Sequence, residues 1–114
     1  MIDRNDNPDY LNSFLDYSIT ILNKSPNSIK EYNYDIAMFL KYIKIRFKLT
    51  DKKDFNAITI SDIPISEIRK IKLEDIHAFL SYLATELKSK PATRARKAST
   101  IRIFFKYFNF FLFP

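Results

Sequence analysis

The stretch TRARKASTIRIFFKYF, residues 93–108, joins a strongly basic segment to a strongly aromatic one and contains no acidic residue. At the roughly 100° that separates successive residues of an α-helix, its apolar side chains gather on one side. These are Ala98, Ile101, Phe104, Phe105 and Phe108. On the opposite side lie Ser99, Arg102 and Lys106, with Ala95 and Arg96 above them. The stretch therefore predicts an amphipathic helix that buries one face and offers hydroxyl and cationic donors on the other.

The same periodicity predicts three other long helices in the chain. The first begins near Pro8 and places on one face Leu11, Phe14, Leu15, Ser18 and Leu22. In the second, Ser25 can cap the helix and Pro26 suits its first position, followed by an apolar stripe of Ile29, Tyr32, Ile36, Phe39, Leu40, Ile43 and Phe47. The third is LEDIHAFLSYLATELK, whose inward residues are Ile76, Phe79, Leu80, Leu83 and Leu87. Pro91 breaks the chain, and the helix of the opening stretch runs from about Ala92 to Phe111.

Residues 50–71 lose the helical period, and their isoleucines are spaced irregularly around Pro64. We interpret this segment as a connector that packs isoleucines onto the core, with one helical turn near Ser66–Arg69. A short strand at Ala57–Ile60 is the alternative, although it lacks an obvious partner. The expected fold is thus all-α, a compact bundle of four main helices plus a short helical turn in the connector.

Composition narrows the possible functions. The chain has 114 residues and neither glycine nor cysteine. This length suits a single domain over residues 1–114. Without cysteine there is no disulfide framework or thiolate metal site, and without glycine there is no glycine-rich phosphate loop. The polar, acidic start MIDRNDNPDY is unlike a signal peptide, and the aromatic run near the end is too short to span a bilayer. We expect a cytoplasmic protein with no membrane role, and the apolar ending NFFLFP suggests a piece of a longer chain.

The net charge of +6 is distributed in alternating blocks. Residues 1–23 carry −3, residues 24–49 carry +4, residues 50–87 carry −2 and residues 88–114 carry +7. A polyanion would therefore meet two basic segments, which contain the second and fourth helices. On the second helix, the stripe opposite the core consists of Asn27, Lys30, Tyr34, Lys41 and Lys48. Cationic and small polar side chains on one helix face suit contact with phosphates, although such faces are also common as solvated surface.

No group of residues in the sequence predicts catalysis, a metal site or a cofactor. His77 has no second histidine or cysteine nearby, so it is not expected to bind a metal. Glu74 and Asp75 are adjacent and diverge on a helix, where they complement the positive helix start rather than form an acid/base pair. We therefore expect no catalytic residue in this chain.

Three motifs together resemble the N-terminal core-binding (SAM-like) domain of tyrosine recombinases, or phage-type integrases, of the Xer-like branch. They are SPNSIKEYNYDIAMF with Tyr32 and Asp35, IRKIKLEDIHAFLSYL, and TRARKASTIRIFFKYF. The resemblance covers nearly the whole chain. The connector at 50–71 is longer than in many relatives.

The resemblance implies a helical domain that clamps duplex DNA, with its second and fourth helices approaching the major groove. It also implies that DNA is cut by a tyrosine of a separate C-terminal catalytic domain, so no tyrosine here is the nucleophile. The expected partners are double-stranded DNA, other recombinase protomers and that catalytic domain. Arg96 and Lys97 are the residues most expected to reach base edges. The residues expected to contact DNA are Ser25, Asn27, Ser28, Lys30, Tyr34, Lys41, Arg94, Arg96, Lys97, Ser99, Arg102 and Lys106.

Two other functions are left open by the sequence. The first is a helical protein-interaction module without a nucleic-acid role, whose interface would be the aromatic tail Phe110–Phe113. The second is a membrane-surface helix over residues 93–113, which is basic on one side and aromatic on the other.

Overall fold

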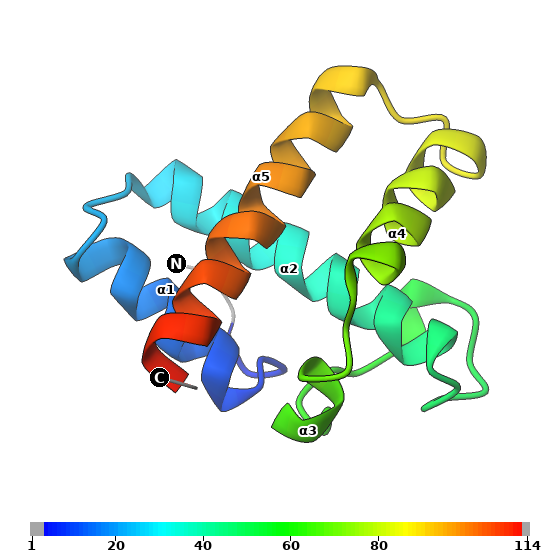
Figure 1. The fold of residues 1–114 in the computed structure, drawn as a ribbon, viewed down its shortest axis with the longest axis horizontal. Helices are drawn as coiled ribbons and strands as arrows, with labels where there is room; N and C mark the ends of the chain where they lie inside the picture. The colour runs from blue at the N-terminus through cyan, green and yellow to red at the C-terminus, as the bar shows by residue number, and fades with distance from the viewer. Residues whose placement is uncertain (1–3, 113–114) are drawn as a thin grey trace. The chain divides into compact units, whose positions relative to one another are not determined.

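The computed structural model describes residues 4–112, and within them every regular element is helical (Figure 1). The long helices are α1 (Asp9–Thr20), α2 (Pro26–Arg46), α4 (Leu73–Thr85) and α5 (Pro91–Tyr107). Short elements are the 3₁₀ turn η1 (Phe55–Ala57), the single-turn helix α3 (Ile65–Ile68) and the π turn η2 (Phe108–Leu112). The all-α fold class with four main helices is confirmed.

The chain divides into two compact units, Met1–Ile65 and Ser66–Pro114. The first unit contains α1, α2 and η1, and the second contains α4, α5 and η2. The division falls at the first residue of α3, the helical turn that the sequence predicts in the connector. That residues 1–114 act as one domain stays a prediction.

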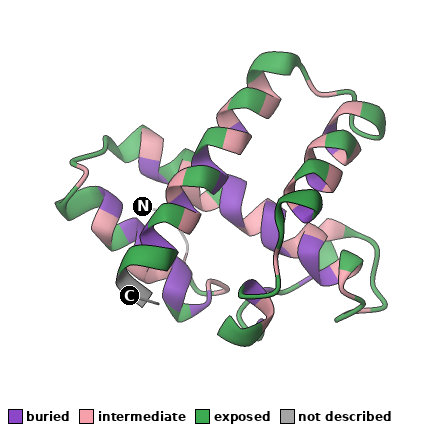
Figure 2. Ribbon diagram, in the orientation of Figure 1, coloured by how far each residue is buried: buried purple, intermediate pink, exposed green. Residues whose placement is uncertain are grey.

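In the first unit, α1 packs against α2 through the apolar stripes that periodicity predicts (Figure 2). Leu11, Phe14 and Leu15 of α1 are buried, and the ring of Phe14 stacks on that of Tyr32 at 5.8 Å between centroids. The buried apolar residues of α2 are Ile29, Ile36, Phe39, Leu40 and Ile43. Leu22 is only half-buried because α1 ends at Thr20, so the expected stripe is one residue too long.

The connector is held by polar side chains rather than by a strand. The Asp6 carboxylate accepts hydrogen bonds from the backbone N–H groups of Ile60 (3.2 Å) and Ser61 (3.4 Å). The Lys44 ammonium donates to the Thr59 carbonyl at 2.8 Å and pairs with Asp62 at 2.7 Å. These bonds satisfy backbone groups that a strand would satisfy by pairing with a neighbour. In the segment held in this way, Ile58, Ile60 and Ile63 are buried. The alternative of a strand at Ala57–Ile60 is therefore wrong, because Ala57 ends η1 and the residues after it have no regular structure.

In the second unit, α4 and α5 pack together and are joined by residues 86–90 (Figure 1). Phe79 and Leu83 of α4 are buried, as are Ile101 and Phe104 of α5. The expectation that Leu87 faces inward is wrong, since α4 ends at Thr85 and Leu87 is 47% exposed. Lys88 follows with φ of 54°, which turns the chain out of the helix. Ile76, Leu80, Ala98 and Phe105 belong to the predicted apolar faces but are half-buried.

At the C-terminal end of α2, a lysine occupies a position that glycine usually takes. The N–H of Lys48 donates to the Ile45 carbonyl, and the N–H of Leu49 donates to the Lys44 carbonyl. This is the Schellman arrangement, in which the residue at the Lys48 position takes a left-handed conformation that favours glycine. The φ of Lys48 is 59°.

Replacing Lys48 by glycine should therefore stabilise the protein. We expect Lys48→Gly to raise the free energy of unfolding by about 0.5–1 kcal/mol, because glycine takes a positive φ without steric cost. Chemical denaturation of Lys48→Gly beside Lys48→Ala measures it. The alanine variant loses the same charge but keeps the Cβ, so equal stability of the two variants would contradict the explanation.

Candidate nucleic-acid interface

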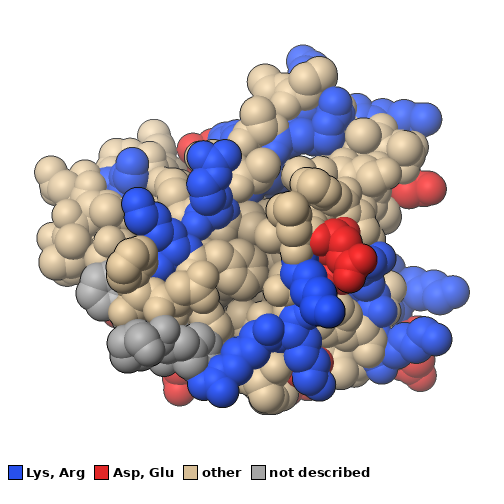
Figure 3. Space-filling view, viewed as in Figure 1, with Lys and Arg blue, Asp and Glu red and all other residues tan. Residues whose placement is uncertain are grey.

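One side of α5 is exposed along its whole length and is rich in donors. Its exposed positions recur every three or four residues, which is the spacing of one helix face. In Figure 3, lysine and arginine side chains project along the course of α5. No aspartate or glutamate occurs anywhere in residues 88–114. We call this face the α5 stripe. It consists of Ala92, Ala95, Ser99, Arg102 and Lys106 of α5, and it continues into η2 with Asn109.

The structure confirms the exposure that the sequence predicts for Ser99, Arg102 and Lys106. Alanines at the N-terminal end of the stripe leave the backbone there uncovered by long side chains, which would let a groove approach closely. Ala92 and Asn109 were not among the predicted site residues. Both could have been found by extending the same spacing by one step in each direction from Ala95 and Lys106.

Lys97 differs from its expectation. It is 4% exposed and lies on the core side of α5 together with Thr100, Ile101 and Phe104. A lysine stem of four methylene groups can be buried along apolar surface, which a count of charges does not anticipate. This burial does not favour the expectation that Lys97 reaches base edges, which stays a prediction, and Lys97 is not among the contacts proposed below.

Arg94 and Arg96 are half-buried and lie outside the α5 stripe. The Arg94 guanidinium donates to the Ser89 carbonyl at 2.5 Å, and so ties α5 to the segment that joins it to α4. Arg96 accepts a hydrogen bond at its backbone carbonyl from the Thr100 hydroxyl at 3.1 Å. The Arg94 side chain is thus engaged within the second unit, and Arg96 is less exposed than Arg102 and Lys106.

The burial of Lys97 gives a testable contrast with Arg102. Methionine is unbranched, uncharged and only slightly shorter than lysine, so Lys97→Met should keep the core nearly filled. We expect Lys97→Met to change the affinity for duplex DNA by less than about twofold, since the ammonium is away from the exposed face. Arg102→Met, which removes an exposed charge from the same helix, should weaken binding severalfold. Fluorescence anisotropy with a labelled duplex measures both, and a larger loss for Lys97→Met would return this residue to the interface.

The predicted stripe on α2 is partly exposed. Asn27, Lys30 and Tyr34 are exposed, as is Lys48 beyond the helix end, whereas Lys41 is half-buried. Ser25 has the capping role that the sequence predicts, and Ser28 is its hydrogen-bond partner. The Ser25 hydroxyl accepts a hydrogen bond from the N–H of Ser28 at 3.2 Å and donates to the Ser28 hydroxyl at 3.1 Å, which caps α2.

A hollow of about 500 Å³ opens beside the start of α2. Its cationic lining residues are Arg4, Lys24 and Lys30, and Asn27 adds an amide. Arg4 also pairs with Asp16 at 2.8 Å. Arg4 and Lys24 were not among the predicted contacts. Lys24 could have been found because it directly precedes the capping serine, whereas Arg4 comes from the acidic segment and only the folded chain brings it here.

Comparison with known proteins gives the family directly. Residues 10–109 match the family described as "Phage integrase, N-terminal SAM-like domain". The chain belongs to this family. It is also 40% identical over 101 residues to a protein named tyrosine recombinase XerC from Caldanaerobacter subterraneus subsp. tengcongensis. That alignment covers 88% of this chain and 29% of the relative, and no solved structure gives a significant match.

The integrase motifs correspond to residues that build this SAM-like fold. In the motif on α2, Tyr32 stacks on Phe14 and Asp35 is fully buried. In the motif on α4, the buried Asp75 accepts a hydrogen bond from the N–H of Lys72 at 2.8 Å and closes the first turn. The motif residues that mark the family therefore stabilise the helices, while the exposed residues between them form the α2 and α5 surfaces.

Other kinds of site are not found in the described part of the chain. Between residues 4 and 112, no cluster of three or more histidine, aspartate or glutamate side chains could hold a metal ion. In the same range, no helix has both the length and the apolar character needed to cross a bilayer. His77 is exposed on α4, as its position off the apolar face predicts. Of the aromatic tail Phe110–Phe113, Phe110 is 67% exposed, and the side chains after it lie outside the described residues.

Proposed function

We propose that this chain is the DNA-binding domain of a tyrosine recombinase and that it holds duplex DNA while a separate catalytic domain cuts and rejoins the strands. The observation that carries the proposal is the α5 stripe, which is exposed, cationic and without acids. Family membership supports the same function. The parent's reaction, through a tyrosine linked to a 3′ phosphate, is proposed by family resemblance, because this chain spans 29% of the length of its recombinase relative.

The contacts we propose are those that combine exposure with a donor group. On the α5 stripe they are Ser99, Arg102 and Lys106 of α5 and Asn109 of η2, and near the start of α2 they are Lys24, Asn27, Lys30 and Tyr34. Arg102 and the lysines suit phosphate oxygens, which fix the position of a protein on the duplex. Small residues above Ser99 suit close approach to a groove. Arg94, Arg96 and Lys41 are half-buried and would contribute chiefly through the local positive potential.

A salt titration tests the proposal. Four lysine and arginine contacts predict that log K falls with log[salt] at a slope of about −3.6, so that binding weakens about a hundredfold between 50 and 200 mM salt. Fluorescence anisotropy on a duplex of about three helical turns measures the slope. A folded, monomeric chain that fails to bind duplex DNA at 50 mM salt would refute the proposal, and the protein-interaction function would replace it.

We also propose that the protein acts in the cytoplasm. Its proposed partners are other recombinase protomers and the parent's catalytic domain. For the protomers, the support is the acidic segment 1–23, whose exposed Asp9 and Asp16 complement a basic surface on a neighbour. Charge reversal at both aspartates should weaken assembly of the full-length parent on DNA. Assembly can be measured by gel shift on a duplex that carries two binding sites. Unchanged assembly would contradict this part of the proposal.

A further inference from the structure

Two hollows open along the line where α4 meets α5 in the second unit, and they share Leu73, Ile76, Phe105 and Asn109. The first has a volume of about 670 Å³ and extends toward the residues after α3, namely Ile68, Arg69, Ile71 and Lys72. The second has a volume of about 530 Å³ and extends along the helices to His77, Leu80, Ala98, Ile101, Arg102 and Lys106. Because they share residues, we treat the two hollows as one groove and call it the α4–α5 groove.

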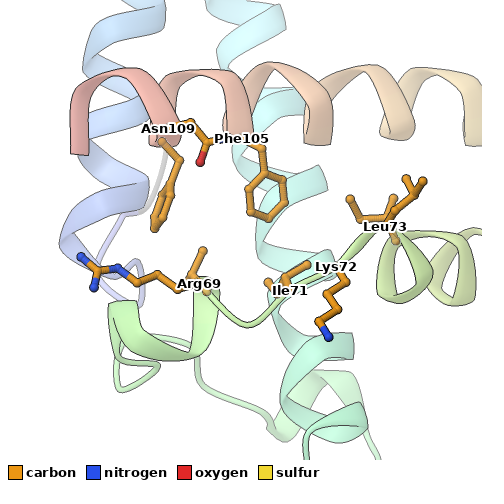
Figure 4. Close-up of a pocket in the computed structure, with 9 residues that line it drawn as sticks. Arg69, Ile71, Lys72, Leu73, Phe105 and Asn109 are labelled. Carbon is orange, nitrogen blue, oxygen red and sulfur yellow. The ribbon is translucent and has the colours of Figure 1, made fainter. Parts of the chain in front are cut away.

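The floor of the α4–α5 groove is apolar and open to solvent. Leu73 is 65% exposed although it begins a helix whose other apolar residues face inward. Phe105 and Ile76 are only half-buried. In Figure 4, the Phe105 ring points from α5 toward the segment that carries Ile71, with Leu73 beyond it. Exposed apolar surface that continues along a groove, rather than scattered singly, marks an interaction site.

The rim of the groove is cationic. Arg69 and Lys72 line one hollow, and Arg102 and Lys106 line the other, whereas neither hollow is lined by an aspartate or glutamate. Of the nearby acids, Glu67 pairs with Lys70 at 3.0 Å and Asp75 accepts from the N–H of Lys72, while Glu74 is exposed next to Leu73 but does not line either hollow. The groove therefore combines an apolar floor with an excess of positive charge at both ends.

We propose that the α4–α5 groove binds an acidic, amphipathic helix of a partner protein. A helix laid in a groove presents apolar residues at i, i+3, i+4 and i+7, and these would contact Leu73, Ile76 and Phe105. Aspartate or glutamate side chains beside that apolar face would lie near the rim cations. This binding goes beyond the proposed contact with DNA. Since Arg102 and Lys106 belong to both surfaces, the acidic helix and the duplex compete for the chain.

The test uses the 114-residue chain and a labelled peptide of about 14 residues built from leucine, glutamate and alanine, with leucines at i, i+3, i+4 and i+7. A scrambled peptide of the same composition, which has no apolar face, is the control probe. We expect the first peptide to bind, the scrambled peptide to bind at least about tenfold more weakly, and added duplex DNA to displace the bound peptide. Equal binding of both peptides would overturn the proposal, because charge alone would then explain it.

Two leucine variants locate the site. Leu73→Gln removes an exposed apolar side chain from the groove without changing charge, and we expect it to weaken peptide binding about tenfold. Leu87→Gln removes another exposed leucine, 47% exposed against 65% for Leu73, which lies two residues after the end of α4 and outside the groove, and it should leave peptide binding unchanged. Circular dichroism confirms that both variants are folded. Equal effects of the two changes, or no effect of Leu73→Gln, would overturn the proposal.

Other occupants of the groove would give different results. Self-association of the chain that Leu73→Gln abolishes, in the absence of peptide binding, would assign the groove to a second copy and overturn the proposal. A loss of duplex affinity in Leu73→Gln as large as its loss of peptide affinity would make the groove part of the DNA surface and would also overturn it. If Leu73→Gln still binds duplex DNA but no longer binds the peptide, the groove is needed for the peptide and not for DNA. The proposed DNA function can then be judged separately from this inference.

Discussion

Replacing Arg102 and Lys106 together by alanine should weaken duplex binding about tenfold at 100 mM salt and flatten the salt slope by about 2. Each exposed cation that neutralises a phosphate releases condensed counterions, and two such contacts would be lost. The loss should be the same on duplexes of different sequence, because phosphates carry no sequence information. Fluorescence anisotropy over a salt series measures both the affinity and the slope.

A matched control separates position from net charge. Lys53→Ala/Lys70→Ala also removes two exposed positive charges. Lys53 lies in the connector and Lys70 lies two residues after the end of α3, and neither is on a proposed surface. We expect this variant to lower duplex affinity less than threefold through the long-range potential alone. If the two double variants lose affinity equally, the α5 stripe has no special role, and DNA responds only to the charge of the whole chain.

The second large effect concerns the stability of the first unit. Lys44→Ala should lower the free energy of unfolding by about 3 kcal/mol, because the ammonium holds both the Thr59 carbonyl and Asp62 and its side chain is only 9% exposed. Removing it leaves a backbone acceptor without its partner and a gap along the buried stem. Urea denaturation measures the loss, and hydrogen exchange should become faster first in residues 58–63.

The pH dependence of the same pair follows from Asp62. The hydrogen bond from Lys44 holds the pKa of Asp62 below its ordinary value; burial opposes this, and the charge of Lys44 adds to the lowering. A lowered pKa in the folded state means that the pair stabilises the protein at neutral pH and that this contribution is lost as the pH falls below about 4. Because Asp62 is 65% exposed, solvent screens the pair, and Asp62→Asn should cost less than about 1 kcal/mol. If Asp62→Asn and Lys44→Ala lowered the free energy of unfolding equally, this would contradict the view that Lys44 stabilises the protein through more than its contact with Asp62.

Local pattern was sufficient to predict the helices and the exposed face of α5. The apolar repeat predicts both the core residues Ile101 and Phe104 and the exposed Ser99 and Arg102, because the same helix period sets both. The cap of α2 also follows from sequence, since Ser25 and Pro26 act within one turn. These features depend on residues no more than four positions apart, so they can be predicted from the sequence alone.

The features that sequence could not predict depend on distant residues or on the length of a side chain. Asp6 holds Ile60, which is 54 positions away, and Tyr10 donates to the Ile63 carbonyl at 3.0 Å across 53 positions. Such bonds leave no periodic pattern in the connector. Tyr10 is buried there, and burial, together with the charge of Asp62, raises the pKa of its hydroxyl. The burial of Lys97 also does not follow from the sequence, because a lysine counts as charge there, although its stem can be buried like an apolar chain.

We propose that duplex DNA contacts the exposed donor faces of α5 and of the start of α2. NMR of the ¹⁵N-labelled chain during titration with a duplex tests it most directly, because each backbone amide reports separately. We predict that the largest chemical-shift changes occur at 92–109 on the α5 stripe and at 24–34, with small changes at Lys97 and in residues 51–63. Changes concentrated instead in the connector, or spread evenly over all exposed lysines and arginines, would contradict the account.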